Sequence, residues 1–195
     1  MAVIINATTT TGLTTSADNS GVIQFQSNGA NTVGISSTGY ITIGGNQQIY
    51  GPAFFANKVG TSQTVTSGTT TKITFNTKQF DTANCFDNTT NYRFTPNVAG
   101  YYQINGTVYA KGTTIGTVIV LIYKNGSALV SGSFQATTAG GGNATSNVSG
   151  FIYLNGTTDY VELYGYVGGT GTITFPDDGT LALTSAFSGA MVRGA

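Results

Sequence analysis

The sequence predicts an all-β protein, and three observations support this fold class. Thr, Val, Ile, Tyr and Phe, which suit a pleated and half-buried surface, recur along the chain. Strong helix formers are scarce, with one Glu, five Lys and two Met among 195 residues. Short apolar runs alternate with clusters of Gly, Asn and Ser, which mark turns between strands.

The first 45 residues contain apolar runs of only three or four residues, separated by turn clusters. Strands this short bury too little surface to fold alone, so the segment needs copies of itself or a platform. We therefore predict an attachment segment at 1–45 and, between two Gly-containing turns, a linker at 46–56. The apolar residues assigned to the attachment segment are Val22, Ile23, Phe25, Val33, Ile35, Ile41 and Ile43.

Residues 57–195 are predicted to form one β domain. Tyr102, Ile104 and Val108 alternate with polar residues and share one face of a strand. Residues 117–123 are apolar at almost every position, so we expect this strand to be covered on both faces. Asn125-Gly126 is a turn signal that joins it to a strand at 128–134 in a hairpin.

Two further predictions complete this domain. We expect a second hairpin, in which residues 155–159 connect a strand at 148–154 to one at 160–167. The last strands are predicted at 173–175 and 181–191. About seven to ten strands at this spacing favour a sandwich or a jelly roll.

Charge and composition exclude several classes of function. Charged residues make up 7% of the chain, against roughly 25% in ordinary domains, and the formal net charge is zero. Without a basic excess, no counterion release drives binding to nucleic acid. The chain also has no His, which removes Ser-His-Asp and Cys-His catalytic relays. These features favour a structural or binding protein over an enzyme.

The predicted head contains a series of landmarks in a specific order. They are Phe94, Pro96, Gly100 and Tyr102, then Lys124-Asn125-Gly126, then Asp159 with Val161 and Leu163, and finally Phe187-Ser188-Gly189. With these landmarks, about residues 57–192 resemble the globular head of complement C1q and its tumour-necrosis-factor-like relatives. This resemblance implies a non-enzymatic jelly roll that associates as a homotrimer about a three-fold axis.

The N-terminal segment, over residues 11–29 and 35–39, is similar to structural proteins of tailed bacteriophages. The two resemblances together imply a homotrimeric protein of the virion surface, with 1–45 as its attachment and trimerisation segment. A fibre or spike knob for host adsorption is the first interpretation, with other virion proteins and a host glycan or protein as partners. A capsid decoration trimer is the alternative, since about 45 residues reach at most about 150 Å. A lectin-like binding module is a third.

Targeting signals are also informative. The start of the chain has neither a basic stretch nor a long apolar run, so no signal peptide is predicted. The longest strongly apolar run, at 118–123, is far shorter than the roughly 20 residues that span a bilayer. We expect synthesis in the host cytoplasm, without membrane insertion.

Two strands of the head have more apolar surface than one core needs, which is typical of an interface between subunits. An ordinary amphipathic outer face is the alternative interpretation of the tyrosines among them. The predicted trimer interface consists of Ile119, Leu121, Tyr123, Tyr160, Tyr164 and Tyr166.

Few residues offer metal or catalytic chemistry. Asp81, Asn84 and Asp87 could supply oxygen ligands to calcium, which some relatives of the resembled family bind. Their spacing lacks the EF-hand pattern, and a capped polar loop is the alternative. Glu162 could form a glycosidase pair with an Asp, but it lies in the middle of a predicted strand. We expect no catalytic residue and no cofactor, with calcium as the one candidate metal.

Overall fold

The computed structural model describes residues 23–27, 30–35, 41–43, 46–47, 51–136, 141–177 and 185–195. The chain divides into two compact units, Met1–Ile49 and Tyr50–Ala195, which we call the N-terminal unit and the head. Every regular element among the described residues is a strand, as the sequence predicts. In this part of the chain no helix is long and apolar enough to cross a membrane.

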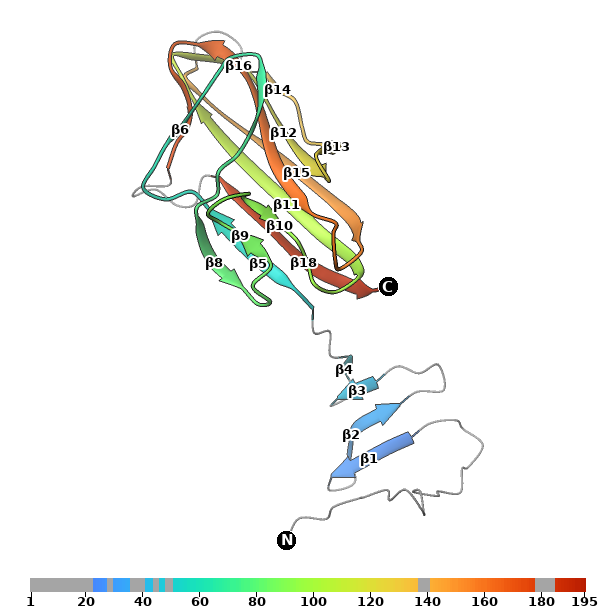
Figure 1. The fold of residues 1–195 in the computed structure, drawn as a ribbon. Helices are drawn as coiled ribbons and strands as arrows, with labels where there is room; N and C mark the ends of the chain where they lie inside the picture. Colours follow the sequence, from blue (N-terminus) through green and yellow to red (C-terminus); the bar gives the residue numbers. More distant parts are fainter. Residues whose placement is uncertain are drawn as a thin grey trace. The chain divides into compact units, whose positions relative to one another are not determined.

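The N-terminal unit contains one antiparallel sheet in the order β1-β2-β3-β4 (Figure 1). In its register Phe25 lies opposite Val33, and Ile35 lies opposite Ile41. Of the predicted attachment residues, Val22 lies outside the described residues. The strands are β1 (Ile23–Ser27), β2 (Ala30–Ile35), β3 (Ile41–Ile43) and β4 (Asn46–Gln47).

The head is a sandwich of two antiparallel sheets. The first, which we call the β11/β18 sheet, has the order β6-β17-β11-β18-β5-β8. The strands β17 and β18 pair with different parts of one edge of β11, and β15 pairs with its opposite edge. Its strands are β5 (Ala53–Asn57), β6 (Gln63–Val65), β8 (Thr77–Asp81), β11 (Gly100–Lys111), β15 (Asn143–Leu154), β17 (Ile173–Phe175) and β18 (Ala186–Gly194).

The second sheet of the head, the β12/β16 sheet, has the order β13-β12-β16-β10-β9. Two short strands extend it, because β14 pairs with β12 and β7 pairs with β16. Its strands are β7 (Thr69–Lys72), β9 (Phe86–Asp87), β10 (Arg93–Phe94), β12 (Thr114–Lys124), β13 (Ser127–Ser131), β14 (Gln135–Ala136) and β16 (Val161–Thr170).

The core of the head lies between these two sheets. On β11 buried and more exposed residues alternate, and Tyr102, Ile104 and Val108 all point inward, as predicted. On β12 the inward residues are buried, but those on the other face, including Ile119 and Leu121, are only half-buried. Residues 117–123 are therefore fully covered on one face, not on both.

The turn at Asn125-Gly126 is a hairpin turn, as predicted. Asn125 and Gly126 have φ values of 52° and 80°, which are the left-handed conformations that a tight hairpin between twisted strands requires. The turn joins β12 to β13, which pair directly.

The second predicted hairpin is wrong. The strand β15 pairs with β11, whereas β16 pairs with β12, so residues 155–159 cross from one sheet to the other. The side chain of Asn155 stabilises this crossing, since its Oδ1 accepts the backbone N–H groups of Thr157, Thr158 and Asp159 at 2.9–3.0 Å. Connections that cross between the two sheets are typical of a jelly roll.

The structure also corrects the predicted linker at 46–56, because β5 lies inside it and the head begins at Tyr50 instead of residue 57. Phe54 of β5 is 1% exposed and lies in the core. Its ring centre is 4.4 Å from that of Phe94, 4.9 Å from Phe86 and 5.0 Å from Phe187. An aromatic residue with three ring neighbours anchors this segment to both sheets.

We predict that Phe54→Ala destabilises the head by about 3–5 kcal/mol, the usual cost of removing a buried Phe side chain. The measurement is the free energy of unfolding in urea. The control is Phe55→Ala, which alters the next residue of β5, a half-buried side chain on the outward face. Equal losses in the two variants would contradict the assignment of Phe54 to the core.

Candidate functional site

The outward face of the β11/β18 sheet presents a group of exposed apolar side chains, which we call the aromatic patch. Its members come from β11, β15 and β18, which run side by side (Figure 1). Exposed apolar groups of this kind on a domain whose core is already filled mark an interaction site. The patch consists of Tyr101, 49% exposed, Phe151, 70%, Tyr153, 42%, and Val192, 44%.

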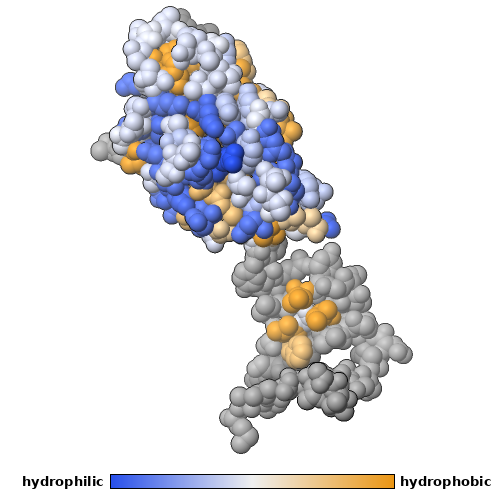
Figure 2. Space-filling model, viewed as in Figure 1, coloured by the Kyte–Doolittle hydropathy of each residue, from blue (hydrophilic) through white to orange (hydrophobic). Residues whose placement is uncertain are grey.

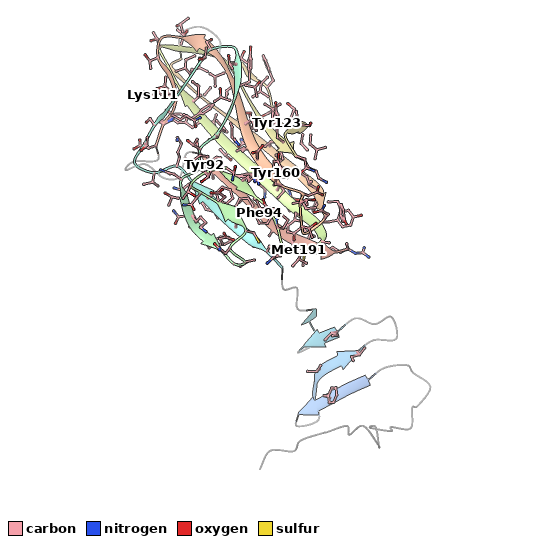
Figure 3. The ribbon with its side chains drawn as sticks, viewed as in Figure 1. Tyr92, Phe94, Lys111, Tyr123, Tyr160 and Met191 are labelled. Atoms are coloured by element: carbon pink, nitrogen blue, oxygen red, sulfur yellow. The ribbon has the colours of Figure 1, made fainter. Side chains whose placement is uncertain are left out.

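Strand pairing places these residues together. Because β11 and β15 pair over 12 residues, Tyr101 lies opposite Tyr153, and their ring centres are 5.5 Å apart. Tyr102, between Tyr101 and the next outward residue, points inward, and its hydroxyl donates to the Val98 carbonyl at 2.6 Å. Burial raises the pKa of Tyr102 to about 12. The patch lies at the Met191 end of β11, opposite the Lys111 end (Figure 3).

A hollow of about 670 Å³ lies beside the patch. Tyr101, Phe151 and Val192 line it together with the last three residues, from Arg193 to Ala195. A concave apolar surface next to exposed rings can receive an apolar side chain from another molecule.

Beyond the patch, the middle of the same outward face is polar. The Gln103 amide donates to Ser149 Oγ at 2.7 Å, and the Ser149 hydroxyl donates to Asn105 Oδ1 at 2.9 Å. Further along, the Thr107 hydroxyl donates to Asn147 Oδ1 at 2.8 Å. These bonds run between β11 and β15, so the middle of the face is an ordered polar surface.

The six residues predicted as a trimer interface lie elsewhere, on the outer side of the β12/β16 sheet and in the loop before β16. All six are half-buried within their own chain. Tyr123 and Tyr164 stack with ring centres 3.9 Å apart, and the Arg93 guanidinium lies 4.2 Å from the centre of the Tyr160 ring (Figure 3). The members are Ile119, Leu121, Tyr123, Tyr160, Tyr164 and Tyr166.

An ion pair lies beside one of these tyrosines, Tyr164. The Lys72 ammonium lies 2.8 Å from Glu162 Oε1, and the side chain of Glu162 is only 5% exposed. The Tyr164 hydroxyl donates to Glu162 Oε2 at 3.4 Å. Burial, reinforced by the charge of Glu162, raises the pKa of Tyr164 above its ordinary value. The outer face of this sheet therefore has its polar and aromatic groups largely matched within the chain.

The candidate calcium ligands do not fit a metal ion. Asp81 Oδ1 accepts the Cys85 N–H, and its Oδ2 accepts the Phe86 N–H and the Lys78 ammonium. Burial raises the pKa of Asp81, but these hydrogen bonds outweigh it and lower the pKa. Asn84 Oδ1 also accepts from Lys78, at 3.1 Å, so a cation already occupies this position.

Both carboxylate oxygens of Asp87 also accept hydrogen bonds from within the chain. Its Oδ1 accepts the N–H groups of Thr89 and Thr90, and its Oδ2 accepts from the Asn91 backbone and side chain. These oxygens cap a turn. Among the described residues, no group of three or more His, Cys, Asp or Glu could hold a metal ion.

Comparison with solved structures shows that the fold is a C1q and tumour-necrosis-factor-like jelly roll. The globular domain of zebrafish complement 1qA superposes with a TM-score of 0.53 and 19% identity, over 75% of this chain and 100% of that one. Eiger TNF from S. frugiperda gives 0.55 and 8%, over 75% and 96%. Murine APRIL gives 0.53 and 7%, over 73% and 100%. Identities this low show a shared fold and nothing finer. The sequence matches no protein-family model and no curated protein.

The residues of the aromatic patch are not among those predicted from the sequence, although the sequence contains a signal for them. Residues 151–154 are Phe, Ile, Tyr and Leu, so this strand is also apolar on both faces. In the structure Ile152 and Leu154 are buried while Phe151 and Tyr153 are exposed. The predicted interface was instead placed near residue 160, where three tyrosines, Tyr160, Tyr164 and Tyr166, lie within seven residues.

The turn at Asp87 predicts a specific pH dependence. The N–H groups of Thr90 and Thr89 hold the pKa of the Asp87 carboxyl well below its ordinary value. The resulting stabilisation is fully present above the unfolded-state pKa of about 3.9 and is lost as pH falls through the lower folded-state pKa.

We therefore expect Asp87→Asn to be less stable than the wild type at about pH 7, with a smaller difference at about pH 3 or below. The measurement is the free energy of unfolding at both pH values. Asp177→Asn removes the same charge outside this turn and is the control. A deficit of Asp87→Asn that is the same at both pH values would contradict the role of the ionised carboxylate.

Proposed function

We propose that the chain is a non-enzymatic, homotrimeric surface protein of a bacteriophage virion, whose head is a fibre or spike knob for host adsorption. The observation that carries the trimer is the aromatic patch on a head whose core is already filled. The virion role is supported by the resemblance of residues 11–29 and 35–39 to structural proteins of tailed bacteriophages. The host ligand is a surface glycan or protein, and synthesis is in the host cytoplasm.

Burial of the patch supplies the driving force for the trimer. Each large apolar side chain contributes about 1.5–3 kcal/mol when it is fully removed from water. The adjoining polar surface of Gln103, Asn105 and Ser149 is uncharged, so three identical copies meet there without like-charge repulsion. The outward face of the β11/β18 sheet is therefore well suited to a symmetric interface.

The outer face of the β12/β16 sheet is less suited to this role. Closing an interface over it would remove water from the Lys72 ammonium and the Arg93 guanidinium, which are already partnered within the chain. Its tyrosines are half-buried and gain less from further burial. In the proposed trimer this face remains in solvent and is available to other partners.

We predict that Phe151→Asp converts a trimer of about 60 kDa, three times the chain mass of 20.0 kDa, into a monomer. The reason is that three carboxylates would be buried at the patch. Light scattering measures the mass. The matched control, Tyr166→Asp, alters the outer face of the other sheet and should leave the trimer intact. The reverse pattern would place the interface on the β12/β16 sheet, and a monomeric wild type would refute the trimer.

We also predict that deleting residues 1–50 leaves a folded trimer that no longer joins the virion, because β5 and every later strand of the head are retained. The measurement is the amount of protein in purified particles, with the full chain as control. Incorporation of the truncated protein at the wild-type level would refute the attachment role. A labelled antibody on intact particles then separates a knob, seen at the tail tip, from a decoration, seen on the capsid face.

A further inference from the structure

One face of the N-terminal sheet presents partly exposed apolar side chains among the described residues. Phe25 pairs with Val33 and Ile35 pairs with Ile41, so paired strands bring apolar residues onto the same face. Phe25 is 45% exposed and Ile41 is 58% exposed, while Val33 and Ile35 on the central strand β2 are half-buried. In Figure 2 the coloured atoms of this unit form an apolar cluster.

A sheet of this size needs a covering partner. Its strands have five, six, three and two residues, and small sheets become stable only when a hydrophobic face is packed against something. Phe25 and Ile41 are still about half exposed, so a partner that covered them would add apolar burial and stabilise the sheet.

The charge pattern indicates what kind of surface covers this face. Residues 19–57 contain no Asp, Glu, Lys or Arg, and Asp18 is the only charged residue before Lys58. A partner recognised by opposite charge would find nothing to pair with. A second copy of the same sheet is complementary, because both surfaces are apolar and neither brings a charge that its counterpart would repel.

We propose that the apolar faces of three N-terminal sheets pack against one another about the three-fold axis of the trimer. This inference rests on the trimeric head of the proposed function. Only residues 48–52 separate β4 from β5, a span of at most about 18 Å. Three heads held together therefore keep the three sheets at an effective concentration on the order of millimolar. At that concentration a weak apolar contact between short strands becomes populated.

The test introduces one charge on each side of β3 in the full-length protein. Ile41→Asp places a carboxylate on the apolar face, where Ile41 is more than half exposed in the single chain, so a lone chain tolerates it. Thr42→Asp places the same charge one residue further along the strand, on the opposite face. The readouts are the mass by light scattering and amide hydrogen exchange over residues 23–47.

We expect all three proteins to remain trimers of about 60 kDa, three times 20.0 kDa, held by their heads. Slow exchange in β1, β2 and β3 should be present in the wild type and in Thr42→Asp, and should be lost in Ile41→Asp. A wild type of 20.0 kDa would instead refute the trimer of the proposed function, so the two failures are distinguishable.

Three outcomes with an intact trimer would overturn the inference alone. Fast amide exchange over residues 23–47 of the wild type would mean that the three sheets do not pack together in the trimer. The apolar face would then be covered only by another protein of the virion. Slow exchange that Ile41→Asp leaves unchanged would mean that the apolar face is not in contact. Slow exchange that is lost on deletion of residues 1–22 would mean that the chain's own start covers the sheet.

Discussion

The pairing of β11 with β15 over 12 residues is the interaction on which the rest of the head depends. Because side chains alternate along a strand, this one register directs Tyr102, Ile104 and Ile152 into the core and Tyr101 and Phe151 outward. A slip of one residue would exchange the two sets. The register that fills the core therefore also creates the aromatic patch, so the stability of the head and its proposed assembly share one cause.

The two outward faces of the sandwich differ in how many of their side chains already have partners within the chain. On the β12/β16 sheet the Lys72–Glu162 pair and the ring stacking of Tyr123 on Tyr164 match polar and aromatic groups within the chain. The Glu162 side chain is only 5% exposed, so this face gains little from a partner. Full burial of a large apolar side chain such as Phe151, which is 70% exposed, is worth about 1.5–3 kcal/mol. This difference is why the proposed interface is placed on the β11/β18 sheet.

Much of this architecture could be predicted from residue patterns, and the exceptions have physical reasons. Alternation predicted the inward face of β11, and Asn125-Gly126 predicted a hairpin, because both depend on neighbouring residues. Whether residues 155–159 form a hairpin or cross between sheets depends on which distant strands pair with β15 and β16. The length of the connection does not decide this, because five residues can serve either purpose. The strand β5 directly follows Gly51-Pro52, a turn signal that favours a linker. Its residue Phe54 packs against aromatic residues far along the chain, Phe94 and Phe187. Which doubly apolar strand stays exposed depends likewise on what packs over it.

The two units of the chain follow one principle at different scales. Each leaves apolar side chains exposed, on the aromatic patch of the head and on Phe25 and Ile41 of the N-terminal sheet. The head fills its core by itself, so in the proposed assembly it can fold first and then trimerise through a patch of large aromatic side chains. The described residues of the N-terminal sheet form no comparable core, and in that assembly their contact becomes favourable only once the heads have brought three copies together. In the proposed trimer, folding of the N-terminal sheet is therefore coupled to assembly of the heads, and an isolated chain would present that sheet only in an incomplete form.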